Sequence, residues 1–369
     1  MKQLKIIFSG GGTGGHIFPA VAIANEVKKL VPGAEILFVG ALGKMEMEKV
    51  PAAGYKIIGI PIAGFQRKFT FSNFKLPFLI IKSLLITKKI ITEFKPDVVV
   101  GTGGYASGPL LKAATANNIP SLIQEQNSYA GITNKLLSKK VSKICVAYEG
   151  MDKFFPKEKL LLTGNPVRQD IKNVDEKRNE SFSYFKLDSS KKTILVVGGS
   201  LGAKAINEAI GLGLDYFVDN NIQLLWQTGK IYFETAKKQS EKFQNKNIIV
   251  VDFISRMDLA YALADVVISR AGAGAISELC IVQKPCILIP LPTAAEDHQT
   301  KNAMALVNKG AAILIKDTVA DKTLVDSAIQ LIKNIDEQEK LKLNIKQLAF
   351  SNSANLIAKE VLKLAGYNI

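Results

Sequence analysis

The chain has 369 residues, of which 47% are hydrophobic, so it is long enough to form two domains with separate cores. Its three cysteines lack a C-x-x-C spacing, which argues against a disulfide framework and predicts buried, reduced thiols of a cytosolic protein. No apolar run approaches the roughly 18 residues of a membrane span, and no signal-peptide pattern precedes the first apolar run.

Positive charge is concentrated in the first half of the sequence. The net charge is +15; residues 1–165 carry 22 lysines and arginines against 10 acidic residues, and residues 166–369 carry 26 against 23. A surplus of this kind suits an anionic partner of some size, which is nucleic acid, an anionic membrane, or both. The alternative is a lysine-rich surface that only keeps the protein in solution.

A glycine-rich turn follows the first expected strand. Residues 4–8 form an apolar run typical of a buried parallel strand, and residues 17–30 carry apolar side chains at helical spacing. Between them lie five glycines and His16, one of two histidines in the chain. Glycines there leave backbone N–H groups open to an anion at the helix N-terminus. We therefore expect a phosphate- or diphosphate-binding turn, with His16 as a candidate acid or base.

The same turn matches the spacing of a dinucleotide-binding fingerprint at Gly10, Gly12 and Gly15. That fingerprint also needs an acidic residue about 20 positions later, at the end of the second strand. The second expected strand, Glu35–Val39, is followed by glycine, alanine and leucine, with no carboxylate at its tip. No Gly-Lys-Ser/Thr follows the turn, so a Walker loop is excluded as well. A nicotinamide oxidoreductase is disfavoured, and a structural glycine turn is the remaining alternative.

Lysines and aromatic residues are interleaved at Phe65–Lys75, ahead of a helix expected over roughly residues 75–94. Lys75, Lys82 and Lys89 recur every seventh residue, and most other positions of the helix are apolar. In one interpretation this wide apolar face is buried against a sheet. In the other, its exposed edge and the preceding loop enter the cytoplasmic leaflet while lysines meet anionic headgroups.

Strands and helices alternate along the whole chain, which predicts parallel sheets with helices on both faces. The other expected strands are residues 97–100, 121–124, 143–147, 193–197, 222–227, 247–251, 265–269, 285–289 and 311–315. Residues 168–188 are polar and irregular, and we expect them to form a linker. The predicted fold is α/β, with doubly wound domains at residues 1–165 and 166–351 whose turns surround one cleft.

Further small-residue turns follow later strands, at residues 101–109 and 198–203. Another, Ala271–Glu278, opens a helix and places a carboxylate where it can accept both hydroxyls of a ribose. Glu278 is alternatively an ordinary residue favoured by the helix dipole, which contributes roughly 0.3–1 kcal/mol. A polar cluster that contains His298, Glu296–Asn302, lies after a further strand, where ligand loops are found.

Seven segments of the chain resemble motifs of the MurG family of N-acetylglucosamine transferases and occur in the same order as in that family. They are residues 10–16, 101–109, 125–127, 164–168, 198–203, 271–278 and 297–302, and they span nearly the whole chain. The resemblance implies the GT-B fold, in which two Rossmann-like domains face a deep cleft. It also implies that a last helix, Asn352–Tyr367, returns to the N-terminal domain, which would then include residues 352–369.

The resemblance implies an inverting transfer of N-acetylglucosamine (GlcNAc) from UDP-GlcNAc to a lipid-linked acceptor. The acceptor is the C4 hydroxyl of undecaprenyl-diphospho-N-acetylmuramoyl-pentapeptide (lipid I), and the products are lipid II and UDP, in peptidoglycan synthesis. Such an enzyme works as a peripheral protein on the cytoplasmic face of the inner membrane. No Asp-x-Asp pair occurs in the chain, so we expect neither a metal nor another cofactor. No nucleic-acid-binding motif is present, and we expect no such partner.

Candidate site residues are carried over from the family by position. The expected contacts to UDP-GlcNAc are Thr13, Gly14, Gly15, Asn127, Arg168, Ser200, Ile254, Ala273, Gly274, Ala275, Ile276, Ser277, Glu278 and Gln299. Among these, Glu278 would bind the ribose, Ser200 the diphosphate and Gln299 the sugar. His16 would be the general base.

The turns of the first half are expected at the same cleft, so they can also serve the acceptor. Gly103, Gly104 and Tyr105 are the candidates for its diphosphate. The division of these turns between donor and acceptor stays open. A UDP-sugar epimerase, or a GT-B transferase with another acceptor, is the alternative function, because the second-half motifs chiefly describe a nucleotide-sugar site.

Overall fold

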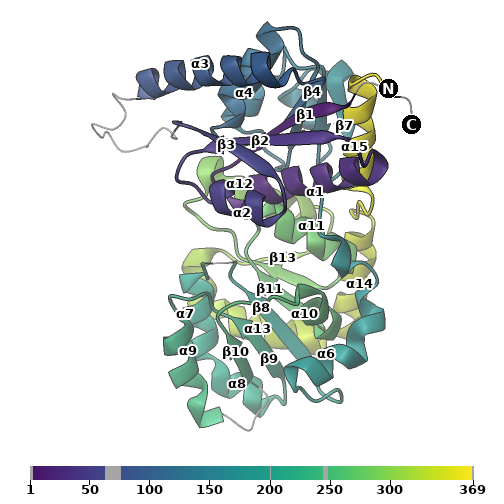
Figure 1. The fold of residues 1–369 in the computed structure, drawn as a ribbon. Coiled ribbons are helices and arrows are strands. Elements are labelled where there is room, and N and C mark those ends of the chain that lie inside the picture. Colours follow the sequence, from purple (N-terminus) through teal and green to yellow (C-terminus); the bar gives the residue numbers. More distant parts are fainter. Residues whose placement is uncertain (1–2, 63–75, 200, 244–247, 368–369) are drawn as a thin grey trace. The chain divides into compact units, whose positions relative to one another are not determined.

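The computed structural model describes residues 3–62, 76–199, 201–243 and 248–367 (Figure 1). It divides into two compact units: residues 1–167 with 352–369, and residues 168–351. Each unit contains one parallel sheet with helices packed against it.

The described part of the first unit contains a sheet of seven parallel strands. They are β1 (Lys5–Gly10), β2 (Glu35–Ala41), β3 (Lys56–Ile60), β4 (Val98–Gly103), β5 (Ser121–Glu125), β6 (Lys143–Val146) and β7 (Leu160–Leu162). Their order in the sheet is β3-β2-β1-β4-β5-β6-β7. The direction of winding reverses between β1 and β4, and ligands of such sheets bind at the carboxyl ends of the strands at this switch point.

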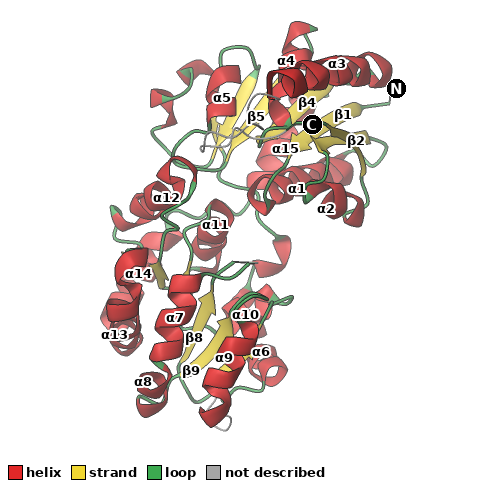
Figure 2. Ribbon diagram, turned by 90° about the vertical axis from the view of Figure 1, so that its left-hand side faces the viewer, coloured by secondary structure: helices red, strands yellow, loops and turns green. Residues whose placement is uncertain are grey.

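Helices cover both faces of this sheet (Figures 1 and 2). They are α1 (Gly14–Leu30), α2 (Glu46–Ala52), α3 (Leu76–Phe94), α4 (Ser107–Ala116), α5 (Ile132–Leu137) and α15 (Ser353–Leu364). Side chains alternate along β1, so Ile6 and Phe8 share a core with α1 and α15, whereas Ile7 shares one with α3 and α4. The last helix, α15, packs on α1 and is tied to it by the hydrogen bond from Asn355 Nδ2 to Glu26 Oε1, 2.8 Å.

The described part of the second unit contains six parallel strands in the order β10-β9-β8-β11-β12-β13. They are β8 (Thr193–Val197), β9 (Gln223–Gln227), β10 (Ile248–Val251), β11 (Val266–Ser269), β12 (Cys286–Leu288) and β13 (Ile313–Leu314). The helices are α6 (Arg178–Phe185), α7 (Lys204–Leu212), α8 (Leu214–Asp219), α9 (Phe233–Ser240), α10 (Met257–Leu263), α11 (Ala273–Val282), α12 (His298–Val307), α13 (Ala320–Lys333) and α14 (Ile335–Lys346). The switch point of this sheet lies between β8 and β11.

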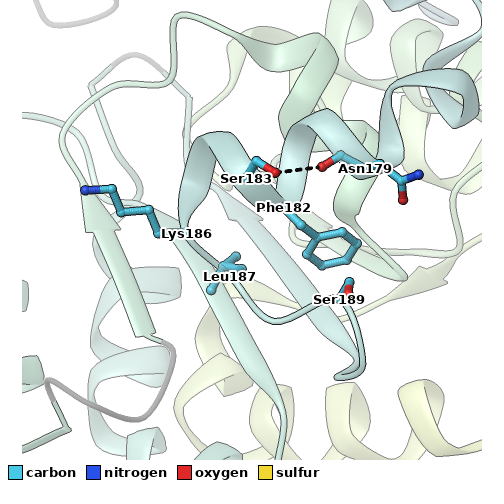
Figure 3. A pocket seen from close by; sticks show the side chains of 6 residues that line it. All are labelled: Asn179, Phe182, Ser183, Lys186, Leu187 and Ser189. Carbon is cyan, nitrogen blue, oxygen red and sulfur yellow. Dashed lines mark hydrogen bonds between the residues drawn. The ribbon is translucent and has the colours of Figure 1, made fainter.

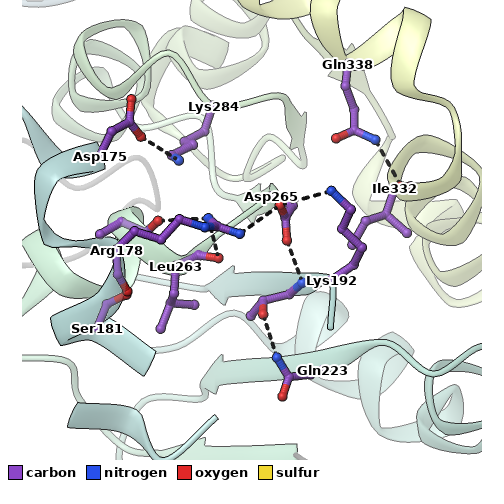
Figure 4. A network of polar contacts seen from close by, with 12 residues as sticks. Asp175, Arg178, Ser181, Lys192, Gln223, Leu263, Asp265, Lys284, Ile332 and Gln338 are labelled. Atoms are coloured by element: carbon purple, nitrogen blue, oxygen red, sulfur yellow. Dashed lines mark hydrogen bonds and ion pairs between the residues drawn. The ribbon is translucent and has the colours of Figure 1, made fainter. Parts of the chain in front are cut away.

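The expectation of a linker at residues 168–188 is wrong, because this segment is an ordered part of the second unit. It forms two short 3₁₀ turns and α6, which packs on α10. Arg178 donates to the carbonyls of Ala262 and Leu263 and to Asp265 Oδ1, at 3.1 to 3.2 Å. Figure 4 shows Arg178 beside Leu263 and Asp265. These partners are distant in sequence, so local composition gave no sign of them.

Two edge strands, β3 and β7, were not among the expected strands. β3 alternates between exposed and partly buried positions and ends on one buried residue. β7 has three residues, and none of them is buried. Edge strands bury less apolar side-chain surface than central ones, and their sequences carry a weaker signal. The central strands are continuous buried runs and lie where they were expected.

The apolar face of α3 is exposed over the first half of the helix, against the interpretation that it is buried. Phe78, Ile81 and Leu85 are 79%, 58% and 65% exposed. The side that packs on the unit carries Ser83 and Thr87, whose hydroxyls donate to the carbonyls of Pro61 and Ser83 at 3.2 and 2.8 Å. The interleaved segment Phe65–Lys75 lies outside the described residues. Of the helices that the structure describes, none has the length and hydropathy of a membrane span.

The three cysteines are buried, as expected. Burial raises the pKa of the Cys145 and Cys280 thiols to about 12, and it raises that of Cys286 as well. They are therefore packing residues and not reactive thiolates.

Candidate active site

The glycine turn after β1 presents a helix N-terminus. Thr13 is the extended residue before α1, and its carbonyl accepts from the N–H groups of His16 and Ile17 at 3.1 and 3.2 Å. The first N–H groups of a helix, here those of Gly14 and Gly15, have no partner within it. The first turn of α1 carries no acidic side chain. A helix start of this kind, at Thr13, Gly14 and Gly15, is suited to an anion.

The turn after β4 packs directly on the turn after β1. Gly11 N donates to Gly103 O at 3.3 Å, and Gly103 and Gly104 have φ angles of +105° and +83°. A Cβ on Gly104 would lie 2.2 Å from Gly11 O, and one on Gly103 would lie 2.8 Å from the His16 ring. Only glycine fits at these two positions. The structure therefore brings His16, Gly103 and Gly104 together, with the half-exposed Tyr105 beside them.

His16 is held by a backbone carbonyl. Its Nδ1 lies 3.0 Å from Gly11 O, and because a carbonyl oxygen only accepts, Nδ1 carries the proton. In the neutral ring Nε2 is then the basic nitrogen. The backbone of His16 is also fixed, since Thr102 Oγ1 donates to His16 O at 2.7 Å. This geometry suits a general base.

Asn127, after β5, is oriented by a buried carboxylate. Glu125 Oε1 accepts from Asn127 N and Nδ2 at 3.1 and 3.3 Å. Its Oε2 accepts from Gly131 N and Asn134 Nδ2 at 3.0 and 2.8 Å. Both oxygens of Glu125 are thus used to shape the turn that presents Asn127.

In the second unit, the small-residue turn after β11 leads into α11, which starts at Ala273 after the extended Gly272. Glu278 lies in the second turn of this helix and accepts a hydrogen bond from Tyr261 Oη at 2.9 Å. Burial raises the pKa of Glu278, while that hydrogen bond and the charge of Arg168 act in the opposite direction. Burial also raises the pKa of the fully buried Tyr261, so this phenol stays a donor.

Arg168 is close enough to Glu278 for their charges to interact. Its Nε and Nη2 donate to the two oxygens of Asp170, both at 2.6 Å, and this bidentate pair raises its pKa. The guanidinium is therefore a permanent cation held near α11. The structure thus brings Arg168, Tyr261 and Glu278 together.

Other expected residues of the second unit lie on separate loops. Gln299 Oε1 accepts from Leu291 N at 2.9 Å, at the start of α12. Glu296 and Asp297, just before this helix, both have φ angles near +55°, which is a strained backbone for non-glycine residues. Ile254 is 5% exposed and offers little surface to a ligand, and Ser200 lies outside the described residues.

The described residues that follow Ser200 pack on the second sheet. Gly202 has a φ angle of +79°, and a Cβ there would lie 2.0 Å from Thr228 O. That carbonyl accepts from Asn207 Nδ2 at 2.9 Å, and Asn207 Oδ1 accepts from Trp226 Nε1 at 3.0 Å. The turn after β8 thus packs on the turn after β9.

Sequence reasoning missed several residues that hold the site residues in place. They are Glu46, Thr102, Asp170 and Tyr261, and Glu125 was included in a motif without a role. Most of their partners are backbone groups or side chains far away in sequence. Two pairs could have been noticed locally, Arg168 with Asp170 and Asn127 with Glu125, because the members of each are two residues apart.

A cavity of about 430 Å³ lies beside α6 (Figure 3). It is lined by Asn179, Phe182, Ser183, Lys186, Leu187 and Ser189. None of these is an expected site residue, and the cavity carries no feature of a catalytic site. Within the described ranges, no cluster of three or more His, Cys, Asp or Glu side chains could hold a metal ion.

Two family models match the chain. The glycosyltransferase family 28 N-terminal domain matches residues 6–146, and the family 28 C-terminal domain matches residues 193–361. With one Rossmann-like parallel-sheet unit at each match, they define a glycosyltransferase of the GT-B class.

Similar proteins narrow this class. A UDP-N-acetylglucosamine--N-acetylmuramyl-(pentapeptide) pyrophosphoryl-undecaprenol N-acetylglucosamine transferase from Phocaeicola vulgatus is 58% identical over 99% of this chain and 97% of that protein. The crystal structure of MurG from Acinetobacter baumannii is 28% identical, with a TM-score of 0.79 over 98% of this chain and 99% of that one. The chain belongs to the MurG family, so the resemblance inferred from the motifs is confirmed.

One neighbour bears on the alternative function. A UDP-GlcNAc 2-epimerase from Neisseria meningitidis has a TM-score of 0.65 over 98% of this chain and all of that one, but it is 15% identical. At this identity the likeness shows a shared fold alone. It does not favour the epimerase alternative.

A charged cluster on α10 predicts a pH effect on stability. Asp258 is buried and accepts from Arg256 and Lys177, all at 2.9 Å, and the pair with Arg256 lowers its pKa most. A carboxyl whose pKa is lower in the folded state adds stability above its unfolded value, about 3.9, and loses it as the pH falls further. Between the unfolded and the folded pKa this stability is lost only gradually. Asp258→Asn should therefore lower the urea midpoint most at about pH 7, and by a smaller but still clear amount at about pH 3.

The exposed Asp326→Asn on α13 is the matched control and should shift the midpoint little at either pH. A deficit of Asp258→Asn that is equally large at both pH values would contradict the role of its ionised form.

Proposed function

We propose that this protein transfers GlcNAc from UDP-GlcNAc to lipid I and releases lipid II and UDP, a step of peptidoglycan synthesis. The observation that carries the proposal is 58% identity over nearly the full length to a relative whose name states this donor and this acceptor. The two sheets, each with glycine turns at its switch point, supply the anion-binding ends that two diphosphate substrates need.

The second unit is proposed to bind the donor nucleotide. Glu278 accepts hydrogen bonds from the ribose hydroxyls, and Tyr261 Oη donates to Glu278 Oε2 and so holds the carboxylate in place. The N-terminus of α11, with its small side chains, and Arg168 attract the diphosphate. Gln299 binds the sugar. The further donor contacts that we propose are Thr13, Gly14, Gly15, Asn127, Ser200, Ile254, Ala273, Gly274, Ala275, Ile276 and Ser277.

The first unit is proposed to bind the acceptor and to start the reaction. Gly103, Gly104 and Tyr105 hold the acceptor's diphosphate, and His16 Nε2 takes the proton of its C4 hydroxyl. The hydroxyl oxygen forms a bond to C1 of GlcNAc from the face opposite UDP, so the configuration inverts. The C1–O bond to the β-phosphate breaks, and its electron pair leaves with UDP. Arg168 and helix N–H groups stabilise the charge that grows there, without a metal ion.

The reaction class is tested by the dependence of UDP release on acceptor. We expect release from UDP-GlcNAc only when a muramoyl acceptor linked to a lipid diphosphate is present, because the donor is activated by attack of the acceptor hydroxyl. A coupled assay for UDP measures it. Turnover of the donor without acceptor would contradict the proposal and favour an epimerase or a hydrolase.

His16→Ala tests the base. Loss of general-base help should lower kcat by a factor of about 10² to 10⁴. The affinity for UDP, measured by calorimetry, should stay the same, since the imidazole contacts the acceptor hydroxyl. Lys28→Ala, an exposed change on the same helix, is the control and should keep wild-type turnover. Unchanged turnover of His16→Ala would exclude the role.

The exposed face of α3 is proposed to dock on an anionic membrane, where the lipid-borne acceptor resides. Phe78, Ile81, Leu85 and Lys89 follow one another at spacings of three or four residues. Lys82 is four residues from Phe78 and three from Leu85, so all five share one helix face. All five are exposed, and the first half of the chain carries the surplus of positive charge. An apolar face flanked by lysines is typical of helices that lie in a lipid interface. We propose the cytoplasmic face of the inner membrane as the location.

Charges placed on this face should weaken membrane binding. Ile81→Asp combined with Leu85→Asp should lower binding to vesicles of anionic lipid at least about tenfold, because two apolar side chains no longer enter the lipid. Leu343→Asp on α14, where the side chain is 64% exposed, is the matched control. Binding of the wild type should weaken with salt. Equal binding of the wild type to neutral vesicles at any salt would count against the proposal.

A further inference from the structure

A carboxylate that the proposed reaction does not use is enclosed beside the first glycine turn. Glu46, the first residue of α2, is fully buried. Its Oε2 accepts from Gly12 N and its Oε1 from Ala41 N, both at 2.9 Å. The side chain therefore ties the end of β2 to the turn after β1.

The surrounding backbone is shaped to admit this carboxylate. A Cβ on Gly11 would lie 2.0 Å from Glu46 Oε1, and one on Gly40 would lie 2.6 Å from its Cγ. Two glycines thus leave room for one buried acidic side chain. Burying a charge is costly unless donors compensate, and here two backbone N–H groups do so.

Glu46 and His16 lie at the two ends of one peptide group. The N–H that Glu46 Oε2 accepts belongs to Gly12, and the carbonyl that accepts from His16 Nδ1, at 3.0 Å, belongs to Gly11. These are the N–H and the C=O of the same peptide bond, and in a trans peptide they point in opposite directions. The peptide group therefore lies between the Glu46 carboxylate and the His16 imidazole and is hydrogen-bonded to both.

This arrangement has an electronic consequence for the imidazole. A negative charge on the N–H side polarises the peptide group and makes its carbonyl a stronger acceptor. The stronger acceptor favours the tautomer with the proton on Nδ1, so that Nε2 is the basic nitrogen. In catalytic triads a carboxylate fixes the histidine directly. Here a peptide group stands between the two, and no proton moves along it.

The turn after β4 packs against the backbone on either side of Gly11. Gly11 N, which belongs to the preceding peptide group, donates to Gly103 O, and Gly104 lies so close to Gly11 O that no side chain fits between them. Rotation of the Gly11–Gly12 peptide would therefore break the hydrogen bonds to Glu46 and His16 at once and disturb the packing of Gly11 O on Gly104.

We propose that Glu46 is a positioning residue, which fixes the tautomer and the orientation of the His16 ring through the Gly11–Gly12 peptide group. The effect on tautomer needs no assumption about the reaction. The effect on turnover rests on the proposed function, in which His16 Nε2 acts as the base.

Nitrogen NMR of the full-length protein tests the proposal. The chain has two histidines, so ¹⁵N-histidine labelling gives two imidazoles, and a His298→Gln sample assigns them. We expect the neutral His16 of the wild type to carry its proton on Nδ1. Glu46→Gln removes the charge, and its amide N–H₂ group faces one of the two backbone N–H donors, Gly12 N or Ala41 N, with which it cannot form a hydrogen bond. It should move His16 towards the Nε2–H tautomer and lower kcat about 10- to 100-fold, with the KM for UDP-GlcNAc changed less than about twofold.

Glu48→Gln, an exposed change of the same kind on the same helix, should alter neither the His16 signals nor kcat. An Nε2–H tautomer in the wild type would overturn the proposal even if Glu46→Gln does not fold. A folded Glu46→Gln that keeps the wild-type His16 signals would overturn it as well. If the tautomer responds but no acceptor-dependent UDP release is found in the wild type, the proposed function fails and this inference stands.

Discussion

The contact between the glycine turns after β1 and β4 is the constraint on which the first unit's site depends. These strands are neighbours at the switch point of the sheet, so their carboxyl ends meet at the same edge. Gly11, Gly103 and Gly104 approach so closely that a side chain on either β4 glycine would displace the His16 ring or its carbonyl partner. The position of His16 is therefore a consequence of strand order and backbone packing.

The second sheet repeats this arrangement with a different pair of turns. The turn after β8 packs on the turn after β9 at Gly202 and Gly229. The carbonyl of Thr228 in the second turn accepts from Asn207, and Asn207 is held in turn by Trp226. The helix end at α11 is instead supported by side chains, since Tyr261 holds Glu278. The first unit thus holds the His16 imidazole through backbone contacts, whereas the second holds the Glu278 carboxylate through the hydroxyl of Tyr261.

The features that could be predicted from the sequence are those that depend on a local pattern of residues, namely the central strands and the glycine turns. Apolar runs identified the central strands, and glycines next to them identified the turns and the family. The sequence could not predict contacts between distant segments: Arg178 anchors α6 to α10, and the segment that looked like a linker became part of a domain. The exclusion of a dinucleotide site used the missing carboxylate after Val39. The structure adds that Glu46, seven residues later, directs its carboxylate to the glycine turn itself.

The positions and pKa values of the cysteines have a practical consequence. Cys145, Cys280 and Cys286 are buried, and their thiols stay protonated well above neutral pH. Thiol-directed dyes react with thiolates, so the native chain behaves towards them as though it had no cysteine. A cysteine introduced at an exposed position of α3 would then take up the dye selectively. Its fluorescence would report on contact with lipid in the otherwise unaltered protein.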